Sequence, residues 1–358
     1  MRLLWAAADY WPVEHGGSGE SVRIQAEALV RAEHSVSVLT PNWEPGTCAS
    51  EGHWAGVRVL RWPNVPTKWA WPSERFFLSC RFVPLVTRAL VEAARVLKPD
   101  LLHAQDRRMI RPVAKAAALL DLPFFVTVRD VGLCCPLATC LLEPRDQIPR
   151  DCSSRKLLRE CLPAWRGGRA GLVDRLKTGL RYRWLAHDRE LAEGARTVIF
   201  VSEGLHRVYH GIGFPSARTA FAIVPSPVEP DPPVPARAPT GRPLGRPLVL
   251  YVGKASIGKG WPEFAEAAAK LGYMADFIHA GAPAASVPAV AELGVLARQD
   301  LWRWYERAAI VCVPSVQQDA LPRVALEAAL AEATVVGPRV GGIPEIVEAK
   351  VTGLLVPP

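Results

Sequence analysis

Two lysines and three glycines fall within eight consecutive residues, Gly253 to Gly260, between a predicted buried strand and a predicted helix. Backbone amides at such a junction, together with ammonium groups, can hold a diphosphate. Lys254 and Lys259 would then supply the positive charge. The segment matches neither the Walker nor the dinucleotide-binding fingerprint, so a glycine-rich turn with solvated lysines is an equally good interpretation of these residues alone.

A second segment, residues 314–327, combines a strand end, a loop and a helix start. Pro322 suits the first turn of a helix, where a missing N–H group costs nothing. The amides around Leu321 and Arg323 have no intrahelical acceptor there, so we expect them to point toward a ligand cleft. An anion at this position would also gain from the helix dipole.

Two carboxylates belong to the same segment. Glu327 lies about one turn into the predicted helix and Asp319 precedes the helix, so both side chains can accept hydrogen bonds from the hydroxyls of one ligand. The alternative makes Asp319 an N-terminal helix cap and Glu327 a solvated surface residue.

Near the N-terminus, a loop that contains Gly16 and Gly17 joins the first predicted strand to the first predicted helix. Glycines in such a loop let the backbone approach a ligand closely. The alternative is an ordinary flexible connection. His15 can act as a base in principle, but a single histidine in a glycine-rich loop is more often merely exposed.

Short apolar segments alternate with stretches of helical period, which is typical of a parallel sheet covered by helices. The first series of predicted strands comprises residues 2–8, 35–40, 57–61, 101–104, 123–128 and 197–201, with helices that include 21–32 and 111–120. The second series comprises strands 248–252, 276–280, 310–314 and 334–336, with helices 261–271, 300–308 and 322–331.

The stretch between the two series is rich in proline and glycine and has neither period, so we interpret residues 225–247 as a linker. The predicted domains are therefore 1–224 and 248–358. Two doubly wound domains place their ligand at the carboxyl ends of the strands. Because the second series is short, we expect the C-terminal domain to be incomplete and to lack its usual terminal helices.

Composition limits the classes of partner. The chain has 358 residues, a hydrophobic fraction of 49% and a formal net charge of +8, which indicates a folded protein with an anionic partner. That partner can be nucleic acid, a phospholipid surface or a phosphate-bearing substrate. No apolar stretch is long enough for a signal peptide or a membrane span, so we expect a cytoplasmic location.

Five of the eight cysteines cluster between Cys134 and Cys161, without the paired CxxC spacing of common zinc sites. Metal binding by this cluster is one interpretation, and reduced buried thiols are the other and the better supported. A secreted disulfide framework is improbable without an export signal.

Several motifs together resemble glycosyltransferase family 4. In the C-terminal half these are Val252-Gly253-Lys254 with Lys259-Gly260, Asp319 eight residues before Glu327, Val340 to Val347, and Thr352 to Pro358. In the N-terminal half they are Gly16-Gly17, Pro99 to Ala104, Val126-Thr127-Val128 with Cys135-Pro136, and Val201-Ser202-Glu203. The resemblance covers nearly the whole chain.

The resemblance implies an α/β GT-B fold with two Rossmann-like domains and retaining transfer from a nucleotide sugar, without a cofactor or a metal. It implies that Lys254 and Lys259 neutralise the leaving diphosphate, with Gly253, Leu321, Pro322 and Arg323 lining the donor site. Glu327 would hold the ribose hydroxyls and Asp319 the hydroxyls of the donor sugar. Gly16 and Gly17 would close over the phosphates.

The sequence departs from the family pattern at four places. Asp319 stands where the family usually has Glu, and Arg129 where it commonly has a histidine that lines the sugar site. Arginine cannot act as a base, but it can donate to phosphate or sugar oxygens, so we include Arg129 among the catalytic candidates. Ser226-Pro227 and Glu332-Ala333-Thr334 also differ from the usual residues, and the family normally continues past the position of Pro358.

Two segments suggest how an acceptor is recognised. Residues 68–82 interleave tryptophan and phenylalanine with basic residues, and residues 166–183 hold six basic residues and one acid. In the second segment Leu172, Leu176, Leu180 and Trp184 recur every four residues and form an apolar helix face. We predict peripheral contact with an anionic membrane surface and a lipid-linked acceptor; core packing beside a solvated basic face is the alternative.

The sequence thus predicts a glycosyltransferase that moves a sugar to a glycan or lipid-linked acceptor in cell-surface polysaccharide or glycolipid synthesis, a pathway that the resemblance alone implies. An impaired relative that only binds a nucleotide or glycan is the main alternative. Nucleic acid is not expected as a partner, because no binding module is recognisable.

Overall fold

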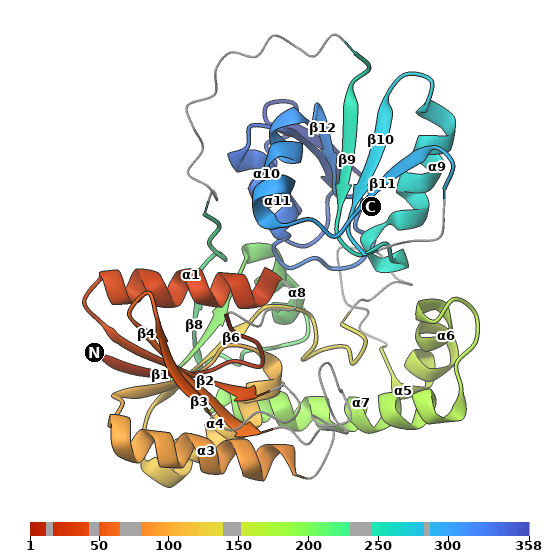
Figure 1. The fold of residues 1–358 in the computed structure, drawn as a ribbon. Helices are drawn as coiled ribbons and strands as arrows, with labels where there is room; N and C mark the ends of the chain where they lie inside the picture. Colours follow the sequence, from red (N-terminus) through yellow and green to blue (C-terminus); the bar gives the residue numbers. More distant parts are fainter. Residues whose placement is uncertain are drawn as a thin grey trace. The chain divides into compact units, whose positions relative to one another are not determined.

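The computed structural model describes residues 1–11, 17–42, 50–64, 81–138, 152–229, 245–282 and 287–357. The chain forms two compact units, shown in Figure 1. Unit 1 comprises residues 1–136, 176–201 and 213–227, and unit 2 comprises residues 137–175, 202–212 and 228–358. Division by chain order, as predicted from the sequence, would place 137–175 and 202–212 with the first domain.

Unit 1 is built on an eight-stranded sheet in which only the edge strand β3 is antiparallel to its neighbour. The strand order is β3 (Ser50–Trp54), β4 (Val57–Asn64), β2 (Ser35–Asn42), β1 (Arg2–Ala6), β5 (Leu101–Ala104), β6 (Phe124–Val128), β7 (Thr197–Phe200) and β8 (Ala220–Ile223). The six strands predicted for this half are confirmed. The two that sequence analysis does not single out, β3 and β8, are the edge strands, whose exposed residues carry little apolar periodicity.

Helices cover both faces of this sheet (Figure 1). Helix α1 (Gly17–Arg31) lies on one face, and α3 (Phe82–Leu97) and α4 (Ile110–Leu120) lie on the other. A short 3-10 helix, η2 (Arg107–Met109), leads from β5 into α4, and α7 (Leu172–Glu193) precedes β7. Val22 and Ala26 of α1 pack against Trp5 and Val38 in one core cluster. Helix α1 begins four residues before its predicted start.

Unit 2 contains a six-stranded, fully parallel sheet. The order is β11 (Val290–Gly294), β10 (Asp276–Ala280), β9 (Leu248–Val252), β12 (Ile310–Cys312), β13 (Thr334–Pro338) and β14 (Gly353–Val356). Its helices are α8 (Glu203–His210), α9 (Trp261–Leu271), α10 (Arg298–Arg307), α11 (Arg323–Leu330) and α12 (Ile343–Ile346), with the 3-10 turn η4 (Ile257–Lys259) before α9. A further short helical run comprises α5 (Ser154–Lys156), the π-helix η3 (Leu157–Cys161) and α6 (Leu162–Trp165).

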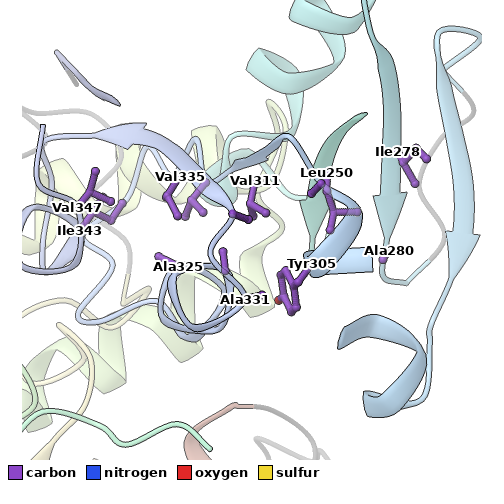
Figure 2. Close-up of a cluster of buried hydrophobic side chains, with 14 of the residues drawn as sticks. Leu250, Ile278, Ala280, Tyr305, Val311, Ala325, Ala331, Val335, Ile343 and Val347 are labelled. Carbon is purple, nitrogen blue, oxygen red and sulfur yellow. The ribbon is translucent and has the colours of Figure 1, made fainter. Parts of the chain in front are cut away.

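Each face of the unit 2 sheet has its own apolar core, because successive side chains of a strand point to opposite faces of the sheet. Leu250 and Val311 pack against α10, α11 and α12, as Figure 2 shows. Val249 and Tyr251 pack against Phe264 of α9 on the other face. A sheet buried on both faces is the doubly wound arrangement that the sequence predicts.

Candidate functional site

The glycine-rich loop that follows β9 is held in place by buried side chains. Gly253 has a φ of +121°, which favours glycine over any other residue. The buried His279 ring is hydrogen-bonded to the Gly253 carbonyl at 2.9 Å and to Glu292 at 2.6 Å. The Tyr251 hydroxyl lies 3.0 Å from the carbonyl oxygen of Lys254, and burial raises the pKa of this tyrosine. The backbone of the loop is therefore tied to buried side chains of β9 and β10.

Two other glycines let this loop lie against the segment that follows β12. A Cβ atom on Gly260 would lie 1.9 Å from the carbonyl oxygen of Pro314, and one on Gly258 would lie 2.2 Å from the side-chain oxygen of Gln317. The carbonyl of Gly258 also accepts hydrogen bonds from the amides of Val316 and Gln317. The two segments that the sequence predicts to bind a ligand, residues 253–260 and 314–327, are thus packed together at the carboxyl ends of neighbouring strands.

Lys259 and Asp319 form the first ion pair of the site. The ammonium nitrogen lies 2.6 Å from the Asp319 carboxylate, which also accepts a hydrogen bond from the Ser315 hydroxyl at 2.7 Å. The Asp319 side chain is 13% exposed and the Lys259 side chain is 41% exposed, so a ligand can reach the pair at the lysine. The structure brings together two predicted residues that are 60 positions apart.

The alternative interpretation of Asp319 as a helix cap is wrong. The N-cap of α11 is Pro322, without a side-chain capping bond. Instead, the Asp319 backbone carbonyl accepts the amide of Gly342 at 2.9 Å, and a Cβ atom on Gly341 would lie 1.9 Å from the same oxygen. The glycines of the Gly341-Gly342 motif therefore fix the Asp319 backbone at the site.

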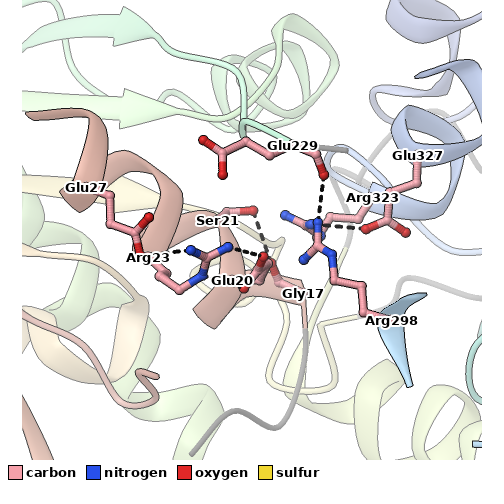
Figure 3. A network of polar contacts seen from close by, with 9 residues as sticks. All are labelled: Gly17, Glu20, Ser21, Arg23, Glu27, Glu229, Arg298, Arg323 and Glu327. Carbon is pink, nitrogen blue, oxygen red and sulfur yellow. Dashed lines mark hydrogen bonds and ion pairs between the residues drawn. The ribbon is translucent and has the colours of Figure 1, made fainter. Parts of the chain in front are cut away.

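Glu327 is held by two partners and is not a solvated surface residue, contrary to the alternative interpretation. Arg323 donates to one carboxylate oxygen at 3.0 Å, and the Tyr305 hydroxyl donates to the other at 2.9 Å. Figure 3 shows the arginine–glutamate pair, whose side chains are 11% and 14% exposed. Burial and the charge of Glu327 raise the pKa of Tyr305 well above its usual value, so its hydroxyl keeps its proton.

The remaining predicted donor residues lie around these pairs. Lys254 is exposed, Leu321 is half-buried and Pro322 is buried. The first internal bond of α11 runs from the amide of Ala325 to the Pro322 carbonyl at 3.0 Å, so the amide of Arg323 precedes the hydrogen-bonded turn, as predicted.

Arg129 belongs to unit 1, at the end of β6. Its guanidinium donates to the Gln105 carbonyl at 2.9 Å, to the side-chain oxygens of Gln105 and Gln25 at 2.8 and 3.0 Å, and to the Ser226 hydroxyl at 3.3 Å. Burial lowers the pKa of Arg129 to about 10, a value that still leaves it charged at neutral pH. Four of its five N–H groups therefore serve contacts within unit 1.

Gly17 is the first residue of α1, whereas Gly16 lies outside the described residues. Arg23 holds the first turns of this helix through hydrogen bonds to Glu20 and Glu27 at 2.7 and 2.8 Å (Figure 3). The hydrogen bond with Glu20 is the main reason that the pKa of Arg23 is raised. The role of Gly16 and Gly17 over the phosphates stays a prediction.

Sequence reasoning missed residues that complete the site, namely Tyr305, Tyr251 and His279. None of them lies in a motif, since each is an aromatic residue on a strand or helix whose sequence signal is that of core packing. Tyr305 sits on the face of α10 that packs against α11, where only the fold reveals its bond to Glu327.

The described residues contain no group of three or more His, Cys, Asp or Glu side chains arranged to hold a metal ion. Cys134 and Cys135 are buried, and Cys140 lies outside the described residues. Burial raises the pKa of the Cys312 thiol to about 12. None of the described helices combines the length and the apolar composition that crossing a bilayer requires.

Solved structures support the fold. Sucrose-phosphate synthase from Thermosynechococcus elongatus has a TM-score of 0.65 and 18% identity, with 100% of this chain and 86% of that chain covered. The Anabaena protein HepE in complex with UDP-glucose has a TM-score of 0.65 and 17% identity, with the same coverage. At this level of identity the likeness shows the GT-B fold and nothing further.

Sequence relatives point to the same class. Glycogen synthase of Mycobacterium tuberculosis is 27% identical over 137 residues, or 36% of this chain and 33% of the relative, so the match spans about a third of the length of that protein. Two family profiles cover most of the chain. A "Glycosyl transferase 4-like domain" matches residues 16–222, and "Glycosyl transferases group 1" matches residues 246–358. The chain therefore belongs to the family 4-like, group 1 glycosyltransferases of the GT-B fold.

Proposed function

We propose that this protein transfers a sugar, with retention of anomeric configuration, from a nucleoside diphosphate donor to a glycan or lipid-linked acceptor. The observation that carries the proposal is the pairing of Lys259 with Asp319 and of Arg323 with Glu327 in unit 2. Both pairs lie beyond strands β9 and β12, where doubly wound sheets bind their ligands. Structures of similar fold support a nucleotide donor, since HepE was solved in complex with UDP-glucose and starch synthase IV from Arabidopsis thaliana was solved bound to ADP.

Glu327 is suited to hold the ribose of the donor. Its two oxygens offer about four lone-pair positions, of which Tyr305 and Arg323 use two. Because both partners donate to it, the carboxylate is fixed in orientation. We assign the remaining lone pairs to the two ribose hydroxyls.

Departure of the nucleoside diphosphate is the charged step. The bond between the anomeric carbon and the diphosphate oxygen breaks, the acceptor oxygen bonds to that carbon, and the acceptor proton leaves with the diphosphate. Lys254, Lys259 and the first amides of α11 would stabilise the developing negative charge, which is the largest single contribution in many enzymes. This chemistry needs no protein-bound metal.

Asp319 would accept hydrogen bonds from hydroxyls of the donor sugar. The Lys259–Asp319 pair then has two tasks, with the ammonium turned to phosphate and the carboxylate to sugar. The bond from Ser315 keeps the shorter aspartate side chain in place where the family usually has Glu. For Arg129, whose guanidinium is largely engaged within unit 1, we propose a positioning role near the reacting sugar instead of proton transfer.

The decisive experiment is calorimetric titration of the protein with UDP, GDP, ADP and their sugar conjugates. One conjugate should bind saturably, and Glu327→Gln should weaken that binding by roughly 1.5 to 3 kcal/mol, the range for hydrogen bonds to a charged group. Glu266→Gln is the matched control, because it removes a carboxylate that also pairs with a cation four residues away but is exposed on α9. Equal affinities in both variants would remove Glu327 from the site.

An impaired relative that only binds nucleotide remains the second candidate, favoured by the engagement of Arg129 within unit 1. Turnover separates the two. An active enzyme releases nucleoside diphosphate from its sugar conjugate in the presence of acceptor, and this release persists with EDTA. A binder releases none.

We propose further that α7 brings the protein to an anionic membrane on which a lipid-linked acceptor resides, in cell-surface polysaccharide or glycolipid synthesis. Leu172, Leu176 and Leu180 are exposed along this helix, whereas Trp184 packs against Arg111 with 4.5 Å between the guanidinium carbon and the ring centroid. The predicted apolar face is thus solvent-exposed over its first three members. Exposed leucines beside arginines favour an interfacial helix.

Liposome co-sedimentation tests the membrane proposal. Anionic vesicles should bring down the protein, and Leu176→Asn should reduce the bound fraction. Leu119→Asn is the control, since Leu119 is exposed on α4 to a similar extent, at 72% against 64% for Leu176. Sedimentation that does not respond to anionic lipid would contradict the proposal.

A further inference from the structure

A second charged cavity lies within unit 1. Its volume is about 100 Å³, and it is lined by the start of α3, the η2–α4 junction, the loop after β6 and the middle of α7. We call it the arginine pocket and define it by its five charged residues, Arg107, Arg108, Arg111, Arg181 and Asp188.

The arginine pocket is lined by more cations than carboxylates. Four arginines and one aspartate line it, and that aspartate, Asp188, is paired with Arg111. Burial raises the pKa of Asp188. Cations gathered in a cleft repel one another and attract an anion of matching size. Guanidinium groups bind phosphate oxygens especially well, because their donors match the geometry of the anion.

Two of the arginines, Arg107 and Arg111, are held by contacts within unit 1. The Arg111 guanidinium stacks over the Trp184 ring and pairs with Asp188. Arg107 donates to the carbonyl of Gly132 at 3.3 Å, and its Nε lies 3.7 Å from Asp130. A Cβ atom on Gly132 would lie 2.4 Å from an Arg107 nitrogen, so only glycine leaves room for this arginine.

The position of the arginine pocket fits substrate binding. Arg107 follows the carboxyl end of β5, and Gly132 follows the carboxyl end of β6. These ends belong to the sheet edge at which a doubly wound unit binds its ligand. Asp106 fixes the turn between β5 and η2, because its carboxylate accepts the amides of Ala8 and Arg108 at 2.7 and 2.9 Å.

We propose that the arginine pocket binds a phosphate group of the acceptor, so that the substrate class is a phosphorylated acceptor. This inference rests on the proposed function, since it assigns the second substrate of the same transfer. The phosphate can belong to a soluble sugar phosphate or to a lipid-linked sugar phosphate, and both present the same anion to the four arginines.

The test is calorimetric titration with inorganic pyrophosphate, a hexose 6-phosphate and the donor nucleotide. The double variant Arg108→Gln/Arg181→Gln leaves the Arg111–Asp188 pair intact and should weaken pyrophosphate and hexose phosphate binding roughly tenfold or more. Arg88→Gln/Arg95→Gln is the matched control, which removes two exposed charges from α3 of the same unit. Gly132→Ala should displace Arg107 and reproduce the loss if the double variant fails to fold.

The outcomes distinguish failure of the arginine pocket proposal from failure of the proposed function. Nucleotide binding that persists in the double variant, with phosphate binding lost, supports the arginine pocket. Unchanged phosphate binding in the folded double variant and in Gly132→Ala overturns it and leaves the donor site standing. Absence of nucleotide binding with arginine-dependent phosphate binding overturns the proposed function instead.

Two arms identify the source of the phosphate. Arginine-dependent binding of the hexose 6-phosphate assigns the pocket to a soluble acceptor. Arginine-dependent sedimentation with zwitterionic vesicles that contain polyprenyl phosphate, but not with vesicles that lack it, assigns the pocket to a lipid-linked acceptor. Failure in both arms contradicts the inference.

Discussion

Unit 2 and unit 1 both gather cations at the carboxyl ends of parallel strands, but they balance the charge differently. In unit 2, Lys259 and Arg323 are each paired with a carboxylate, Asp319 and Glu327. In unit 1, four arginines and one aspartate line the arginine pocket; Asp188 is paired with Arg111, and Arg107 lies 3.7 Å from Asp130. A nearly neutral set of pairs can recognise hydroxyls and phosphates of one ligand together, whereas an excess of arginine selects for the anion alone. This difference is the basis for our proposal that unit 2 holds the nucleotide sugar and unit 1 a simpler phosphate.

The largest expected effect follows from removing the cation of the first pair. Lys259→Met should lower kcat by about 10²- to 10³-fold, as loss of one oxyanion-stabilising group does. Nucleotide affinity should fall less than kcat, because the negative charge that Lys259 would stabilise grows as the diphosphate departs. The assay is release of nucleoside diphosphate from the sugar conjugate, with Lys270→Met on α9 as an exposed control. An equal loss of kcat in Lys259→Met and Lys270→Met would contradict a specific role for the Lys259–Asp319 pair of unit 2.

A smaller effect concerns the stability of unit 1 in acid. Burial, and then the charge of Arg129, lower the pKa of His103 to about 3, so this ring is neutral in the folded state. In the unfolded chain the same ring binds a proton with a pKa of about 6.5. The free energy of unfolding therefore falls as the pH decreases from about 6.5 toward 3, by no more than about 1.4 kcal/mol per pH unit. His103→Gln should flatten this part of a stability profile measured with urea. A variant profile parallel to that of the native chain would show that another group controls acid unfolding.

The smallest expected effect is the response to salt. Added NaCl should weaken pyrophosphate binding at the arginine pocket severalfold more than nucleotide binding in unit 2, because salt screens the attraction between an anion and several cations more than it affects hydrogen bonds to hydroxyls. Titrations at two ionic strengths measure the difference. Parallel loss at both sites would mean that the charge balance of the two units does not determine their ligands.

Much of the architecture could be predicted from the sequence, because buried parallel strands and amphipathic helices carry strong apolar patterns. Helix α9 has the predicted bounds, and β9 and β10 do too. The edge strands β3, β8, β11 and β14 were not singled out, since their exposed and half-buried residues carry weak patterns and pairing with a neighbour defines them.

The charged residues of the site could be predicted from the sequence, but their contacts and the aromatic residues that hold them could not. The motifs contain Lys259, Asp319 and Glu327, yet nothing local indicates that Lys259 pairs with a residue 60 positions away. The arginine pocket was missed for the same reason, although Arg107 and Arg108 directly follow a predicted strand end, which is the signal that could have found them. Four segments of chain supply the pocket, so only the fold assembles it.

The most direct test of the central claim is to titrate the donor nucleotide sugar and inorganic pyrophosphate into two variants, Lys254→Gln/Lys259→Gln of unit 2 and Arg108→Gln/Arg181→Gln of unit 1. We predict that the lysine variant loses binding of the nucleotide sugar and keeps arginine-dependent binding of pyrophosphate. The arginine variant should lose that pyrophosphate binding and keep the nucleotide sugar. Loss of the nucleotide sugar in the arginine variant, with full affinity in the lysine variant, would contradict this prediction.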